Sequence, residues 1–360
     1  MPNVMRERWV AVAIMAAAAG LWAGPVAGQG GAAAAAPPRM RYVAVHDPVF
    51  VPASKAVFAQ DGDLVVGVAR GKTAKAYMAA DLWQHGSVDD QMPDGPIEVT
   101  WCSACGTAAV FRAELNGRRL HFEYDSMMNA NEVHRDVETG SRWQQSTGEA
   151  IDGPLKGSTL TLYDFVLTTW KEWRTRYPNT QLLQPMPGYL ERMDVVRGIM
   201  TRSRTGEGAA PDGAFNKDDR LRPRELIAGL AVGNETMAFQ IAALQKTRVV
   251  NERLGGVPIV VIHQPASETT TAYEARVKDR VLRFDEANAG ATALIDRETK
   301  STWNAYGLAT KGPLKGTQLR PLILIPEFWF AWSQFRPGTR LFHGCGADHP
   351  CDVSRDSLTR

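Results

Sequence analysis

The sequence predicts a β-rich α+β fold in which a mainly antiparallel unit occurs twice in tandem. Three observations support this prediction. Blocks of residues recur in the same order, short apolar runs alternate with turn residues, and each copy ends with one tryptophan-rich helix. The chain of 360 residues is long enough for two such units to build a large core.

The recurring blocks are separated by about 160 residues, a period far longer than that of a solenoid repeat. The matched positions are residues 96–100 with 258–262, 136–143 with 296–303, 153–157 with 312–316, and Trp170, Trp173 and Pro178 with Trp329, Trp332 and Pro337. Duplication of a domain or half-domain explains this order. The pairs Asp136/Trp143 and Asp296/Trp303 occur in both copies, which favours a structural role in which the aspartate binds turn amides beside a packed tryptophan.

Local patterns predict the elements of the first copy in order. Apolar and alternating runs predict strands at residues 64–68, 73–77, 97–102, 107–113 and 120–124. Gly71 and Lys72 predict a turn between the first two strands, and Asn116-Gly117 predicts a tight hairpin before the last.

One helix is expected to close each copy. Thr168 or Thr169 is suited to cap the first helix, whose residues Trp170, Trp173 and Tyr177 share one face. The second copy repeats this spacing at Phe328, Trp332 and Phe335. Such aromatic stripes are typical of core packing rather than of a ligand site.

The N-terminal residues have the pattern of an export signal. A basic start precedes an uncharged, alanine-rich run, and small residues near Gly28 suit signal-peptidase cleavage. We expect a signal peptide at residues 1–28 and a flexible leader at residues 29–40, with an uncleaved N-terminal anchor as the alternative. No later segment is apolar enough to span a membrane, so the mature protein is expected to be soluble and periplasmic or secreted.

The rest of the chain is expected to divide into four parts. These are the first copy at residues 41–183, a long connection at 184–225, a degenerate second copy at 226–342 and a Cys/His tail at 343–360. The connection is rich in glycine, proline and charge, and its composition fits either a segment packed over a site or plain disorder. The formal net charge of +2 gives no electrostatic basis for binding nucleic acid.

A Cys-x-x-Cys pair, Cys102 and Cys105, occurs only in the first copy. The second copy carries Gln264 and Ser267 at the matching positions, and Thr247 falls near the position that matches His85. Thiolate and imidazole are ligands for copper(I) and zinc, and methionine adds to the preference for copper(I). We therefore predict a soft-metal site at His85, Cys102 and Cys105, to which Met127 and Met128 can contribute.

The same pair has two other interpretations. Two such thiols can exchange electrons with a partner dithiol, or they can form an inert disulfide in an exported protein. A thioredoxin fold is excluded because the pair precedes a strand and a hairpin rather than opening a helix. Covalent haem attachment is excluded because Gly106, not histidine, follows Cys105.

Other candidates are weaker. The tail holds Cys345 and Cys351 with His343 and His349, and a disulfide that closes this loop is favoured over a metal site. His121 and His134 are expected at the surface. Glu123 and Asp125 are the carboxylates that a hydrolase could use, although no nucleophile elbow, phosphate loop or His-Glu-x-x-His motif is present.

The chain resembles the bacterial family catalogued as domain of unknown function 3179 (DUF3179). The resemblance rests on His85, residues 100–106, 136–143, 147–151 and 153–157, the Trp170/Trp173 helix and residues 219–221, and it covers about residues 45–342. Val137 stands where the family usually has arginine, and Ser103-Ala104 stand where it usually has Pro-Leu. The family implies a location and an architecture but no reaction.

Two functional hypotheses follow. The first is an exported protein with a thiol-redox or soft-metal site in the first copy, whose partner is an unknown periplasmic protein or a metal donor. The second is a non-catalytic extracytoplasmic interaction or scaffold protein whose cysteines form structural disulfides.

Overall fold

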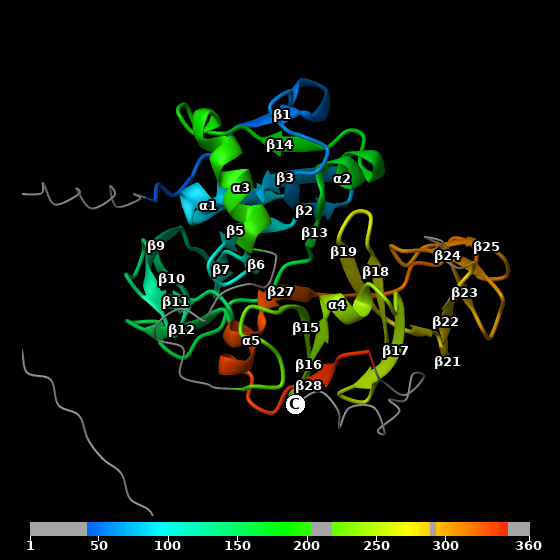
Figure 1. Cartoon of the computed structure of the whole chain (residues 1–360). Helices are drawn as coiled ribbons and strands as arrows, with labels where there is room; N and C mark the ends of the chain where they lie inside the picture. The colour runs from blue at the N-terminus through cyan, green and yellow to red at the C-terminus, as the bar shows by residue number, and fades with distance from the viewer. Residues whose placement is uncertain (1–41, 204–217, 289–292, 345–360) are drawn as a thin grey trace, which may run out of the picture. The chain divides into compact units, whose positions relative to one another are not determined.

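The computed structural model describes residues 42–203, 218–288 and 293–344, all of which fall in the same structural unit (Figure 1). We call residues 42–203 the first half and residues 218–288 with 293–344 the second half. The expected signal peptide (1–28) and leader (29–40) lie outside the described residues, as do Cys345, His349 and Cys351 of the tail. Within the described ranges, no helix combines the length and apolar character that crossing a bilayer requires.

A five-stranded sheet with the order β1-β14-β3-β2-β13 opens the first half. Its strands are β1 (Phe50–Pro52), β14 (Gln181–Leu183), β3 (Thr73–Met78), β2 (Leu64–Arg70) and β13 (Val166–Thr169). Neighbours pair antiparallel except β14 and β3, which run parallel. The short helix η1 (Ala53–Lys55) follows β1, α1 (Ala79–His85) follows β3, and α2 (Trp170–Arg176) follows β13.

Three smaller sheets complete the strands of the first half, in the orders β4-β5-β6, β7-β8 and β12-β11-β10-β9. Their strands are β4 (Ser87–Met92), β5 (Gly95–Cys102), β6 (Thr107–Arg112), β7 (Glu114–Leu115), β8 (Arg118–Arg119), β9 (Phe122–Met128), β10 (Asn131–Asp136), β11 (Arg142–Gln144) and β12 (Glu149–Asp152). All of these neighbours pair antiparallel. The two-residue turn predicted at Asn116-Gly117 joins β7 to β8, and both of its residues have positive φ.

The second half arranges its sheets in a matching order. The order β27-β15-β16-β28 matches β13-β2-β3-β14, and in each set the last pair is the parallel one. The strands are β15 (Leu226–Val232), β16 (Glu235–Gln240), β27 (Leu324–Phe328), β28 (Arg340–Phe342), β17 (Val249–Leu254), β18 (Val257–Gln264), β19 (Thr269–Glu274), β26 (Pro321–Leu322), β20 (Arg276–Val277), β21 (Arg280–Val281), β22 (Phe284–Glu286), β23 (Ala293–Asp296), β24 (Thr302–Asn304) and β25 (Ala309–Lys311). The helices are α4 (Ile241–Leu244) and α5 (Trp329–Phe335).

A tryptophan packs on a strand glycine in each half. Trp173 of α2 lies directly against Gly67 of β2, and Trp332 of α5 lies directly against Gly229 of β15, so that a Cβ at either glycine would overlap the indole ring. Both tryptophans are buried and donate their ring N–H to a threonine seven residues later. The helix thus sits on the sheet at a distance that only glycine permits.

The repeated Asp/Trp pairs have the predicted structural role. Asp136 accepts hydrogen bonds from the amide of Thr139 at 2.6 Å and from the ring N–H of Trp143 at 2.8 Å. Asp296 accepts the equivalent bonds in the second half, from Thr299 and Trp303. Each carboxylate therefore fixes a turn and the tryptophan packed beside it.

The connection between the halves is partly helical. The short helix η2 (Leu190–Arg192) leads into α3 (Met193–Ser203), whose residues Met193, Val196 and Met200 are buried in the core of the first half. Figure 1 shows α3 beside α1, with which it is in contact. Residues 190–203 of the connection are therefore helical and pack on the first half.

The β-rich, largely antiparallel fold is confirmed, and β2, β3, β5, β6 and β9 lie close to the predicted positions. The N-cap expected at Thr168 or Thr169 is Thr169, whose Oγ1 accepts from the amide of Glu172. α1 was not expected, because it has only seven residues and its N-cap, Met78, has no side-chain oxygen to signal a helix start.

We predict that Gly67→Ala and Gly229→Ala each lower the free energy of unfolding by about 1–3 kcal/mol, because the added methyl group overpacks the indole contact. Urea denaturation measures the change. Gly62→Ala is the control, since nothing lies within 4 Å of the position that its Cβ would occupy. Equal effects at Gly62 and Gly67 would contradict the packing argument.

Candidate functional site

The Cys-x-x-Cys pair lies in the turn between β5 and β6. Cys102 is the last residue of β5, and it forms a disulfide with Cys105 across a Cα–Cα distance of 5.4 Å. The backbone N–H of Cys105 donates to Sγ of Cys102 at 3.1 Å. Gly106 follows with φ +69°, a left-handed conformation that lets the chain enter β6 directly. The sequence therefore brings the two sulfurs together through local turn geometry.

Both cysteines are fully buried, with 0% of either residue exposed. Their cover includes Ala130, from the turn after β9, and Phe328, Phe330 and Ala331 of the second half. The two halves are also hydrogen-bonded here, because the N–H of Phe328 donates to the carbonyl of Cys105 at 2.8 Å. A reagent or partner must therefore separate the halves before it can reach either sulfur.

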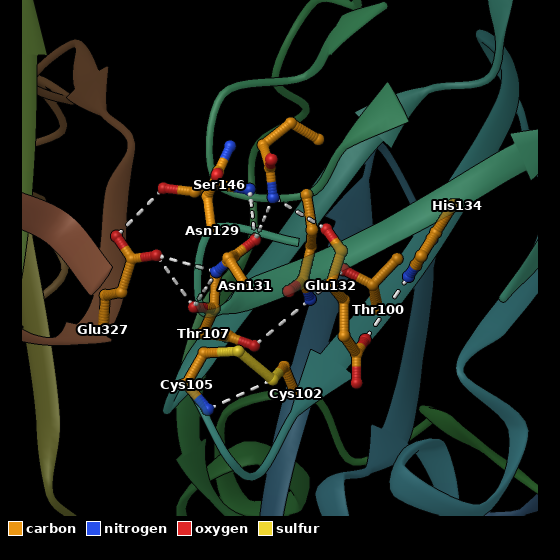
Figure 2. The surroundings of a disulfide bond; sticks show 12 residues. Thr100, Cys102, Cys105, Thr107, Asn129, Asn131, Glu132, His134, Ser146 and Glu327 are labelled. Carbon is orange, nitrogen blue, oxygen red and sulfur yellow. Dashed lines mark hydrogen bonds and ion pairs between the residues drawn. A yellow bond between two sulfur atoms is a disulfide. The ribbon is translucent and has the colours of Figure 1, made fainter. Parts of the chain in front are cut away.

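A buried carboxylate from the second half lies next to the disulfide. Figure 2 shows Glu327 of β27 facing Thr107, Asn131 and Ser146 of the first half. Its carboxylate accepts hydrogen bonds from these three side chains at 2.9, 3.1 and 3.1 Å. Burial raises the pKa of Glu327, and the guanidinium of Arg336, 3.7 Å away, opposes that rise. The network joins the halves through fully desolvated polar groups.

A second buried network lies inside the first half, around His134 (Figure 2). His134 Nδ1 is 2.6 Å from Glu98, which also accepts a hydrogen bond from Ser87, and its Nε2 is 3.3 Å from Glu132. The surface position expected for His134 is wrong, because the residue is only 2% exposed. Burial alone would lower its pKa, but the charge of Glu98 and the bonds to both carboxylates outweigh burial and raise the pKa to about 10.

His85 has contacts that do not involve the sulfurs. It is the last residue of α1, where its Nδ1 lies 2.8 Å from the carbonyl oxygen of Val43 and its Nε2 lies 3.5 Å from Oδ1 of Asp81. Its ring also packs on Tyr189, at 5.0 Å between centroids. The pairing of Ser87 with Thr100 brings the end of α1 to the end of β5 that carries Cys102. The structure thus brings Cys102 and Cys105 together and gives His85 other partners.

Met127 and Met128 are the last residues of β9. Met127 is 40% exposed, and the turn that follows Met128 supplies Ala130 to the cover of the disulfide. Across residues 42–203, 218–288 and 293–344, no group of three or more His, Cys, Asp or Glu side chains is arranged to hold a metal ion.

The described residues also line a partly open cavity of about 950 Å³. Both halves line it: small and apolar side chains such as Ala80 and Leu64 come from the first, and Ala242 and Leu324 from the second. Polar groups reach it too, among them Arg176 and His263. No local pattern in the sequence predicts this cavity, because it depends on small side chains from separate elements meeting in space.

We predict that the free energy of unfolding decreases between pH 6.5 and about 10, because folded His134 keeps a proton that the unfolded chain loses over this range. His134→Gln should make this decrease shallower. Urea denaturation at several pH values from 6 to 9 measures it. His121→Gln is the control, since that ring is 33% exposed and pairs with Glu138 outside the network. Parallel profiles for the wild type and His134→Gln would contradict the prediction.

Comparison with known proteins locates the chain in a family without a described activity. The family profile described as "Protein of unknown function (DUF3179)" matches residues 43–339. No curated protein and no solved structure matches the chain. The match extends over nearly all the residues that carry the fold, the disulfide and the cavity, so the chain belongs to the DUF3179 family.

Proposed function

We propose that this chain is an exported, non-catalytic binding protein that takes a small-molecule ligand into the cavity between its halves, and that its disulfide is structural. The cavity carries this proposal. Its volume of about 950 Å³ lies at the upper end of the range for small-molecule sites, and its lining combines apolar walls with a few polar groups. The basic start, apolar run and small residues at the N-terminus support export.

We further propose that the two halves arose by duplication of one unit. The matching strand orders, the two glycine–tryptophan contacts and the two Asp/Trp turns support this origin. The cavity draws matched residues from both copies. Asp63 and Glu225 line it from equivalent positions, as do Leu64 and Leu226. A binding site formed where the two copies meet explains why neither copy alone carries a sequence motif for this cavity.

The geometry around the disulfide favours a structural role over thiol exchange. Exchange requires a partner thiolate to approach a sulfur along the S–S axis. Phe328 and Phe330 cover the sulfurs, and the Phe328–Cys105 hydrogen bond ties the cover in place. The bridge therefore fixes the β5–β6 turn on which the second half packs.

One observation favours a soft-metal site as the second candidate function. The amide of Cys105 donates to Sγ of Cys102, and such bonds stabilise a thiolate as they do in metal-binding turns. Reduction of the disulfide by a dithiol would supply two thiols, and Met127 and Met128 end β9, just before the turn that supplies Ala130 to the disulfide cover. Copper(I) is the ion that suits this ligand set.

We predict that the uncharged fluorophore N-phenyl-1-naphthylamine binds the wild type and that Ala242→Trp weakens binding at least tenfold, because the indole fills part of the cavity. Fluorescence titration measures the dissociation constant. Ala231→Trp is the control, since Ala231 is exposed and does not line the cavity. Equal binding by both variants would exclude the cavity as the site.

We predict that replacing both Cys102 and Cys105 by serine lowers the free energy of unfolding by about 2 kcal/mol, the value expected for a very short disulfide loop. Fluorophore binding should persist in the folded variant, because neither cysteine lines the cavity. Urea denaturation and fluorescence titration measure the two properties. Loss of binding with the fold retained would contradict a purely structural disulfide.

The metal candidate has a separate test. If it is correct, the reduced wild type should bind copper(I) with a higher stoichiometry than the double-serine variant under anaerobic conditions. Competition with a chromogenic chelator measures both stoichiometries. Equal values for the two proteins would remove Cys102 and Cys105 from any copper site.

A further inference from the structure

We infer that the ligand of the cavity is an organic acid, an apolar or aromatic body with one carboxylate, and that Arg176 binds the carboxylate. This inference rests on the proposed function, because it names the ligand class for the same cavity. Three features of the described residues carry it: the fixed position of Arg176, the pairing of the other charged groups in the lining, and the apolar walls.

The guanidinium of Arg176 is held in place by aromatic rings. Arg176 is the last residue of α2, and its guanidinium carbon lies 3.5 Å from the ring centroid of Tyr306 and 5.2 Å from that of Tyr177. The hydroxyl of Tyr306 donates to Glu172 at 2.5 Å, which fixes the ring that supports Arg176. Stacking on a ring face leaves the N–H edge of a guanidinium available for a planar, bidentate acceptor such as a carboxylate.

The N–H groups of Arg176 have no acceptor in the part of the chain that the structure describes, where no hydrogen bond or ion pair joins them to another residue. The other arginines of the lining are bound in two-point ion pairs. Arg197 contacts both carboxylate oxygens of Asp63 at 2.7 Å, and Arg222 donates to Glu225 at 3.0 and 2.8 Å. Arg176 is thus the lining arginine whose charge is left for a ligand.

The carboxylates of the lining do not compensate this charge. Asp63 and Glu225 are taken by their arginines, and Asp164 lies 3.6 Å from Arg70. Glu268 also has an interaction partner. Arg176 is part-buried, and a bound anion would supply its guanidinium with an acceptor in place of water at this end of the cavity.

The remaining lining suits an apolar body. Leu64, Ala80, Ile241 and Leu324 line the cavity, and its volume of about 950 Å³ far exceeds the space that a simple inorganic anion requires. His263 adds one more polar contact. Burial lowers its pKa to about 4, so the ring is neutral at pH 7, and its Nε2 has no hydrogen-bond partner among the described residues.

The test compares one fluorescent acid with its neutral ester. The probes are 11-(dansylamino)undecanoic acid and its methyl ester, titrated into the full chain by fluorescence. The wild type should bind the acid about 10- to 100-fold more tightly than the ester, which is the range for charge-assisted hydrogen bonds to a carboxylate. Arg176→Gln should abolish this preference and leave the affinity for the ester unchanged.

Arg174→Gln is the matched control. Arg174 lies on the same helix, pairs with Asp61 and does not line the cavity, so its variant should keep the preference for the acid. Equal affinity of the wild type for acid and ester, or equal loss of preference in both variants, would overturn the role of Arg176. Failure of both probes to bind would instead count against the cavity as a binding site, and thermal unfolding would show that each variant is folded.

Discussion

A carboxylate that is removed from water must receive hydrogen bonds from the protein, and this requirement determines how the two halves of the chain meet. Glu327 is fully buried and obtains its bonds from Thr107, Asn131 and Ser146, none of which belongs to its own half. Losing one side of such a network would leave charge or dipoles unpaired at a cost of several kcal/mol. These hydrogen bonds therefore fix the position of one half against the other, which apolar contact alone would not do.

Strand β27, which carries Glu327, also supplies residues to the cavity and to the cover of the disulfide. β27 carries Leu324 and Pro326, which line the cavity, then Glu327, then Phe328, which covers the disulfide. A shift of one residue along β27 would turn Glu327 away from its partners. The contact between the halves, the burial of the disulfide and one wall of the cavity therefore all depend on the position of β27, a strand of five residues.

Local patterns predicted much of the fold. The alternating runs located β2, β3, β5, β6 and β9, and the repeated Asp/Trp pairs indicated a turn that an aspartate stabilises. These features depend on neighbouring residues, which is why sequence was sufficient. The site was harder to predict. Nothing near His134 indicates that Glu98 lies against it, and nothing near Glu327 indicates three partners about two hundred residues away. The spacing Glu132-x-His134 was the one local hint, since alternate residues of a strand share a face.

The closed cover over Cys102 and Cys105 has a consequence for biosynthesis. An oxidising enzyme acts on thiols that it can touch, and the docked second half leaves no sulfur surface exposed. An enzyme that oxidises these thiols would therefore act most readily on the N-terminal portion before the second half docks on it. The order in which the chain emerges, with the cysteines more than two hundred residues ahead of Phe328 and Phe330, suits that sequence of events.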